Sequence, residues 1–401
     1  MATVKAIAKP ELLRWARESA GLSLDDAARR LQTKPEKLLL WESGEEPTTL
    51  AKLRKMAQVY KRLFSDFFLP APPAEETIPH DFRRMPGEVA HTYSPPLLHQ
   101  LRMAHTRRAI LRDLLDELDA EVPTFGFQTS LNRNPEAVGQ QIRNFLQISI
   151  DTQRSWARDA GQSARKAYKN WRSAIEAHGV LVFQFVGVST RESLGFSLAF
   201  EMLPVVAVNQ KSHPNSRAFS LFHELTHLML SRSGLCDFEE ELQPSRDDQA
   251  VEKFCNHVAG ATLVPAEFLV ADPIVADHRP GVPEWSDQEL EALSRKYSVS
   301  EEVVLRRLLI LGRTTPRAYQ RKRAEFIERY AHLELERREG QEDREVKRNM
   351  PREALSNLGR NYTHLILESF HQDQITLADA SRYLSLRPEQ VQKLEQIILA
   401  E

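Results

Sequence analysis

Hydrophobic residues recur at helical spacing through the first 70 residues, and they predict a small helical unit. Its first apolar stripe lies between residues 12 and 16, and Gly21 follows where that helix should end. Ser23 with Asp26 three residues later predicts the cap of a second helix. Thr33-Lys-Pro-Glu36 predicts a third helix, with a cap at Thr33 and proline in its first turn. A tight turn between the second and third of four or five short helices is typical of a helix-turn-helix domain.

The pattern of polar and apolar residues changes several times after residue 70. A proline-rich stretch predicts a linker, and apolar residues at helical spacing return afterwards. Three short apolar runs rich in β-branched residues then predict the strands of a small sheet. The helical stretches expected before the sheet are 97–118, 135–147 and 151–177, and the strands are Gly179–Val186, Phe196–Phe200 and Val205–Val208.

These patterns predict an α+β protein that is mainly helical. The region beyond Pro273 is helical and highly charged. We therefore expect four segments: a helix-turn-helix domain over 1–70, a linker over 71–96, a domain with the small sheet over 97–272, and a helical C-terminal region over 273–401.

Composition narrows the class of protein without deciding its function. Hydrophobic residues make up 41% of the 401 residues and the formal net charge is −2, so the chain as a whole has no excess of basic residues for nucleic acid. No apolar run approaches the length of a membrane span, and no N-terminal targeting segment is present. Cys236 and Cys255 cannot build a disulfide framework. We expect a cytoplasmic protein that makes no membrane contact.

The segment Ser220–Leu230 places His223, Glu224 and His227 among apolar residues. On a helix, residues four apart share one face, so the two histidines can offer nitrogens to one metal ion, with Glu224 beside it. This His-Glu-x-x-His arrangement is typical of zinc hydrolases. The competing interpretation is a pair of core histidines bonded to the backbone, but burying all three groups without partners would cost several kcal/mol.

A catalytic zinc site needs a third protein ligand and one open position. Glu252 lies near the apolar face of the next predicted helix, which makes it the expected third ligand, with a solvated carboxylate as the alternative. Asn256, one turn later, is placed to orient a ligating histidine. His257 is an alternative ligand, and His213, on the preceding loop, is a candidate for steadying an oxyanion. The ligand types favour Zn²⁺, with manganese as the alternative.

The zinc site would support hydrolysis of a peptide bond. Zinc held by His223, His227 and Glu252 lowers the pKa of a bound water towards neutrality. Glu224 is expected to take the proton from that water and pass it to the leaving amine.

The same residues resemble the ImmA/IrrE family of metallopeptidases, and the N-terminal unit resembles the XRE-type helix-turn-helix domains often fused to it. Two positions depart from the usual family pattern: Thr226 stands where glycine is usual and Val264 where methionine is common. The motifs that carry the resemblance are Gly179–Phe183, Pro204–Asn209, Arg217–His227, Glu252 with Asn256 and Ala259, and Leu263–Pro265.

The resemblance implies a zincin-like peptidase domain and a zinc-dependent endopeptidase that cleaves or controls a transcriptional repressor or a toxin. The alternative it implies is a non-catalytic, DNA-binding antitoxin that neutralises a neighbouring PIN-like nuclease toxin and autoregulates its operon. A zinc aminopeptidase is a weaker third option, because no carboxylate cluster for a substrate amine is evident.

Two further interactions stay open from sequence. Thr33, Lys34 and Lys37 lie near the start of the third helix, where a helix-turn-helix domain contacts DNA. Acidic residues crowd the same segment and repel phosphate, so a protein-docking role for this unit competes with DNA binding. The C-terminal region has no assigned role, and docking a partner, sensing a signal and forming a homodimer all remain open.

Overall fold

The computed structural model describes residues 8–73, 80–81, 93–118, 120, 124–157, 163–231, 234–236, 246–278, 282–342 and 348–400. The chain divides into two compact units, one of residues 1–78 with 87–106 and the other of residues 79–86 with 107–401. Each unit has its own core of buried apolar side chains.

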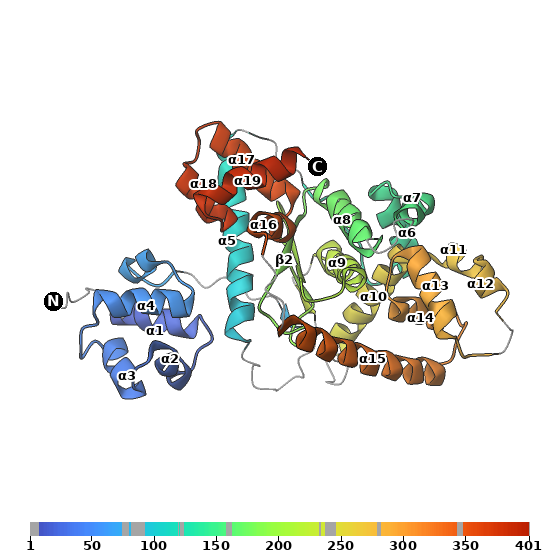
Figure 1. Ribbon diagram of the computed structural model, residues 1–401, viewed down its shortest axis with the longest axis horizontal. Helices are drawn as coiled ribbons and strands as arrows, with labels where there is room; N and C mark the ends of the chain where they lie inside the picture. The colour runs from blue at the N-terminus through green and yellow to red at the C-terminus, as the bar shows by residue number, and fades with distance from the viewer. Residues whose placement is uncertain are drawn as a thin grey trace. The chain divides into compact units, whose positions relative to one another are not determined.

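Over the described residues 8–73, the N-terminal unit contains four short α-helices and a 3₁₀ helix (Figure 1). The cap predicted at Ser23 is confirmed, because its hydroxyl accepts a hydrogen bond from the Asp26 backbone N–H at 3.1 Å. The cap predicted at Thr33 is wrong. The elements are α1 (Pro10–Glu18), α2 (Leu24–Leu31), α3 (Pro35–Ser43), α4 (Leu50–Tyr60) and η1 (Phe64–Phe68).

The third helix is capped at Lys34, which is extended at φ −88° and ψ 147°. Proline disfavours the helical conformation in the residue before it, so Pro35 keeps Lys34 outside the helix. Thr33 instead donates its backbone N–H to the carbonyl of Ala28 at 2.9 Å, closing the turn that follows α2.

The second unit is built around a small mixed sheet with the strand order β1-β5-β3-β4-β2. Strand β4 pairs in parallel with β2 and antiparallel with β3. The three strands predicted from sequence are present, and every residue of them is buried, which explains their continuous apolar runs. The strands are β1 (His80–Asp81), β2 (Leu181–Phe185), β3 (Gly195–Leu198), β4 (Val205–Asn209) and β5 (Gly234–Cys236).

Helices before and after the sheet enclose one large core. The predicted stretch 151–177 contains two helices rather than one continuous helix. Helix α9 packs against β3, β4, α8 and α10, and α10 packs against α6. The helices that line this core are α6 (Pro135–Phe145), α7 (Ile150–Trp156), α8 (Ser163–Glu176), α9 (Pro214–Met229) and α10 (Arg246–Leu263), and the residues of α5 (Pro95–Glu117) are divided between the two units.

The helices beyond residue 265 join this unit in two ways. Leu290, Val304 and Phe326 belong to the same core as the side chains of α9. Farther along, α16 packs on β2, and Tyr362 meets Phe183 edge to face with ring centroids 5.7 Å apart. The helices are α11 (Ala266–Val270), α12 (Pro273–Ala276), α13 (Asp287–Tyr297), α14 (Glu301–Ile310), α15 (Pro316–Glu342), α16 (Met350–Leu358), α17 (Arg360–His371), α18 (Leu377–Leu384) and α19 (Pro388–Leu399).

The predicted fold class, a mainly helical α+β protein with a helix-turn-helix unit and a small sheet, is confirmed. The predicted domain limits at residues 70, 96 and 272 stay predictions. Within the described ranges, every helix is too short or too polar to cross a bilayer.

Candidate metal centre

Helix α9 carries the first group of candidate ligands and is almost entirely buried from Ala218 onward. It begins with Pro214, whose fixed φ suits the first helical position. His213 precedes it as the cap, and its Nδ1 accepts a hydrogen bond from the Asn215 backbone N–H at 3.3 Å. His213 therefore lies at the start of the helix, where its ring satisfies a backbone group.

His223, His227 and Glu252 lie together at the contact between α9 and α10. The Nε2 atoms of the two histidines are 3.0 Å apart. Glu252 Oε2 lies 3.4 Å from His223 Nε2, and Glu252 Oε1 lies 3.2 Å from His227 Nε2. The exposed fractions of these side chains are 3%, 0% and 15%, so the group is enclosed by protein with a small opening at the carboxylate.

This geometry fits a divalent cation. Ligand atoms held about 2.0–2.2 Å from a tetrahedral zinc ion lie roughly 3.3–3.6 Å from one another. The separations of 3.0, 3.2 and 3.4 Å are close to that spacing, and the three candidate atoms all lie within 4.8 Å of one another. Two imidazoles and one carboxylate are also a donor set that zinc prefers.

The neighbouring residue Asn256 sets which nitrogen of His223 faces the centre. Its Oδ1 lies 3.0 Å from His223 Nδ1, and an amide oxygen only accepts hydrogen bonds. His223 therefore donates from Nδ1, which leaves the lone pair of Nε2 directed at the other two candidate ligands. One turn of α10 thus supplies both the carboxylate and the residue that orients the ring.

The electrostatics of the centre favour a positive charge between these side chains. Burial by itself lowers the pKa of His223, but the carboxylates of Glu252 and Glu224 raise that pKa above its ordinary value. Burial conversely raises the pKa of Glu252, yet both histidines hold the pKa of this carboxyl well below its ordinary range. A buried carboxylate between two imidazoles is electrostatically suited to a cation.

Glu224 is fully buried and lies against strand β3. A Cβ added to Gly195 would lie 2.9 Å from Glu224 Oε1 and 3.0 Å from its Cγ. The strand therefore needs glycine at this position so that the carboxylate can occupy its place. Gly195 was missed in the sequence, where a single glycine beside an apolar strand run was the available signal.

The other candidates lie elsewhere. His257 points into a different cluster and binds Glu136 through Nε2 at 2.6 Å. Thr33, Lys34 and Lys37 lie in the N-terminal unit, at the turn and the first helical turn of α3. Lys37 forms an ion pair with Glu46 there.

Two segments of the chain are similar to known protein families. Residues 175–309 match the family model for the IrrE N-terminal-like domain, and residues 11–62 match a helix-turn-helix domain model. A curated relative, the radiation response metalloprotease IrrE of Deinococcus deserti, is 31% identical over 114 residues, which cover 28% of this chain and 37% of the relative. The match thus spans little more than a third of the relative. The expected resemblance to this peptidase family and to helix-turn-helix domains is confirmed.

Proposed function

We propose that this protein is a zinc-dependent endopeptidase whose substrate is a regulatory protein, either a transcriptional repressor or a toxin. The observation that supports this proposal most directly is the convergence of His223, His227 and Glu252. Glu224 is buried on α9, the helix that carries both histidines. The similarity of residues 175–309 to the IrrE N-terminal-like domain, and the name of the metalloprotease relative, point to the same chemistry.

In the proposed mechanism the two histidines and Glu252 hold a zinc ion, with Asn256 keeping His223 in its ligating tautomer. When bound, zinc supplies an activated water near neutral pH and polarises the peptide carbonyl. Glu224 acts as the general base, takes the proton of the attacking water on its carboxylate, and delivers it to the departing amine. Gly195 leaves the space that this carboxylate needs.

The N-terminal helix-turn-helix domain supports a regulatory protein as the substrate. A helix-turn-helix domain positions a protein at DNA, where repressors act. Thr33, Lys34 and Lys37 are the proposed contacts to DNA from the start of α3. The substrate sought first is therefore a DNA-binding repressor or a toxin encoded next to the gene for this chain.

The test replaces the proposed base while leaving the ligands in place. The purified chain and Glu224→Gln are incubated with zinc and with each protein encoded beside the gene, and products are identified by mass spectrometry. We expect wild-type cleavage, a loss of at least about 100-fold in Glu224→Gln from the removed general base, and equal zinc content by elemental analysis.

Glu284→Gln is the matched control, because this carboxylate is 55% exposed and paired on the surface with Arg321. It should cleave at the wild-type rate. Cleavage by Glu224→Gln at the same rate would contradict the role of Glu224. Zinc binding without cleavage, together with a tight complex with a neighbouring toxin, would favour the antitoxin alternative.

A further inference from the structure

The segment around α18 resembles α2 in sequence, with the same residue at five of ten positions. Leu22-Ser-Leu-Asp-Asp-Ala-Ala-Arg-Arg-Leu31 corresponds to Ile375-Thr-Leu-Ala-Asp-Ala-Ser-Arg-Tyr-Leu384 without a gap. In both copies three residues follow before a Pro-Glu pair opens the next helix. Neither family match extends to residues 348–400, so the second copy lies outside the segments already assigned.

The backbone of the two copies agrees as closely as the sequence. Thr376 caps α18 as Ser23 caps α2, and its hydroxyl accepts from the Asp379 backbone N–H at 3.2 Å. Ser385 ends α18 with φ 54° and ψ 39°, a left-handed conformation like that of Gln32, with φ 54° and ψ 54°. Among the described residues, these two segments therefore share the helix cap, the left-handed turn residue and the proline that opens the next helix.

A left-handed turn between two helices is not sufficient for DNA binding, as α13 and α14 demonstrate. Ser298 also ends α13 in the left-handed conformation, and Val299 closes that turn to Ser294. The following helix α14, however, buries Val304, Leu308 and other side chains in the core. Helix α19 differs because it buries only Val391 and Leu394 and leaves most of its surface open.

The open face of α19 carries side chains suited to base edges. Arg and Lys bind guanine, and Gln binds adenine, in the major groove. The corresponding positions of α3 hold Leu39 and Leu40 where α19 holds Gln392 and Lys393. From the helix cap onward, the exposed polar and charged residues are Arg387, Glu389, Gln392, Lys393 and Gln396, so one carboxylate lies among the side chains of this face.

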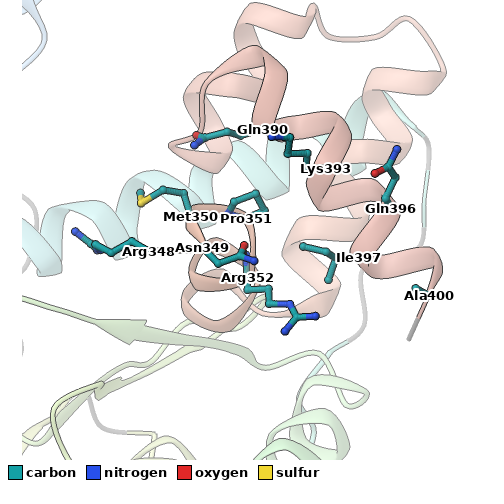
Figure 2. Close-up of a pocket in the computed structure, with 10 residues that line it drawn as sticks. All are labelled: Arg348, Asn349, Met350, Pro351, Arg352, Gln390, Lys393, Gln396, Ile397 and Ala400. Carbon is teal, nitrogen blue, oxygen red and sulfur yellow. The ribbon is translucent and has the colours of Figure 1, made fainter. Parts of the chain in front are cut away.

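A cationic cavity adjoins the same helix. It has a volume of about 620 Å³ and lies between the start of α16 and α19 (Figure 2). Arg348 and Arg352 approach from the α16 side and Lys393 from α19, and no described residue lining it is acidic. Arg348 also forms an ion pair with Glu353 at 2.6 Å, which offsets part of its positive charge. Backbone N–H groups at a helix start and nearby cations are the usual partners of phosphate.

We propose that α18 and α19 form a second helix-turn-helix that binds duplex DNA. Helix α19 enters the major groove with Gln392 and Gln396 facing the bases. Lys393, on the cavity side of α19, contacts a phosphate backbone together with Arg348 and Arg352. The chain then has DNA-binding elements both before and after the peptidase domain, and the C-terminal one has the side chains better suited to sequence reading.

The experiment isolates this surface within the full-length chain. Lys34→Ala with Lys37→Ala first removes the N-terminal contacts, and this chain selects duplexes from a pool of random 30-base-pair DNA. Binding of an enriched duplex is then measured by fluorescence anisotropy at several salt concentrations. Adding Arg387→Ala with Lys393→Ala should weaken binding at least tenfold and reduce the slope of log affinity against log salt by about 2. Gln392→Ala with Gln396→Ala should relax the selected sequence and leave the salt slope unchanged.

Arg295→Ala is the control for loss of one exposed cation, because its side chain is 68% exposed on α13, away from the proposed surface. It should bind within twofold of its parent. Thermal melting of each variant checks that the fold is retained. The proposal is overturned if the parent selects no duplex, if Arg387→Ala with Lys393→Ala leaves affinity and salt slope unchanged, or if Arg295→Ala loses as much binding.

Discussion

The ionisable residues of α9 combine deep burial with close mutual contact. His223, Glu224 and His227 are buried, and Glu252 reaches the two histidines from α10. Buried side chains in packed helices keep one rotamer, so a metal ion would find these atoms already in position. The same rigidity should make the site sensitive to a methyl group added at Gly195, which lies against Glu224.

Gly195→Ala tests that sensitivity. The new Cβ would lie 2.9 Å from Glu224 Oε1 and 3.1 Å from the Ala207 carbonyl, so the carboxylate must move. A displacement of about 1 Å in a catalytic group can cost on the order of 100-fold in rate. We expect kcat to fall by about that factor with unchanged zinc content, measured by a cleavage assay and elemental analysis. In Gly126→Ala the added Cβ meets no atom within 4 Å, so wild-type activity is expected there, and equal loss in both variants would refute this role of Gly195.

At the scale of elements, an ion-pair cluster joins three helices beside the candidate metal centre. Glu136 of α6 accepts two hydrogen bonds from Arg307 of α14, at 2.6 and 2.8 Å, and lies 2.6 Å from His257 of α10. Arg307 is 1% exposed and also donates to the Val264 carbonyl at 2.9 Å. Because α10 carries Glu252, this cluster stabilises the helix that delivers the third candidate ligand.

The cluster predicts acid sensitivity of folding. Burial raises the pKa of Glu136, but the hydrogen bonds from His257 and Arg307 outweigh it and lower the pKa from 4.5 to about 2. A folded pKa below the unfolded value means that the ionised carboxylate stabilises the fold above about pH 4.5 and that this contribution disappears as the pH falls towards 2. Glu136→Gln should therefore lower the free energy of unfolding at pH 7 by roughly 2 kcal/mol, allowing for solvent screening.

Urea unfolding of Glu136→Gln and the wild type at pH 7, 4.5 and 3 measures this difference. We expect the gap to shrink as the pH falls. Glu291→Gln is the control, because its side chain is 59% exposed and its ion pair with Arg295 is on the surface. A gap that does not change with pH would rule out the ionised Glu136 as its source.

At the scale of the whole molecule, the two compact units predict separable unfolding transitions. A metal ion that binds the folded centre stabilises only the unit that contains α9 and α10, by RT ln(1 + [Zn²⁺]/Kd). At a zinc concentration 100 times Kd this is about 2.7 kcal/mol. Calorimetry should therefore show one transition that moves to higher temperature with zinc and returns with a chelator.

Two variants make the thermal experiment specific to the centre. Glu252→Ala should abolish the zinc-dependent shift, because it removes one of the three converging ligands. Asn256→Ala should keep a smaller shift, since loss of a residue that orients a ligand typically costs 10- to 100-fold in metal affinity. A full shift in Glu252→Ala would place the zinc elsewhere in the protein.

Local patterns in the sequence were sufficient wherever neighbouring residues decide the structure. The cap at Ser23 and the three buried strands depend on residues only a few positions apart. The shared face of His223 and His227 follows from helical periodicity in the same way. The cap predicted at Thr33 is wrong because Pro35 restricts the residue before it, which is a competing local effect.

Contacts between residues far apart in sequence were decided only by the tertiary structure. Three such contacts join separate elements. Glu252 and Asn256 approach α9 from α10, Gly195 lies against Glu224, and Glu136 forms an ion pair with Arg307. The same holds for the exposed face of α19, since α14 follows a similar turn but is buried. Periodicity in a sequence specifies which face of an element is apolar. Which partner covers that face depends on how all the elements pack at once, and that information is not local.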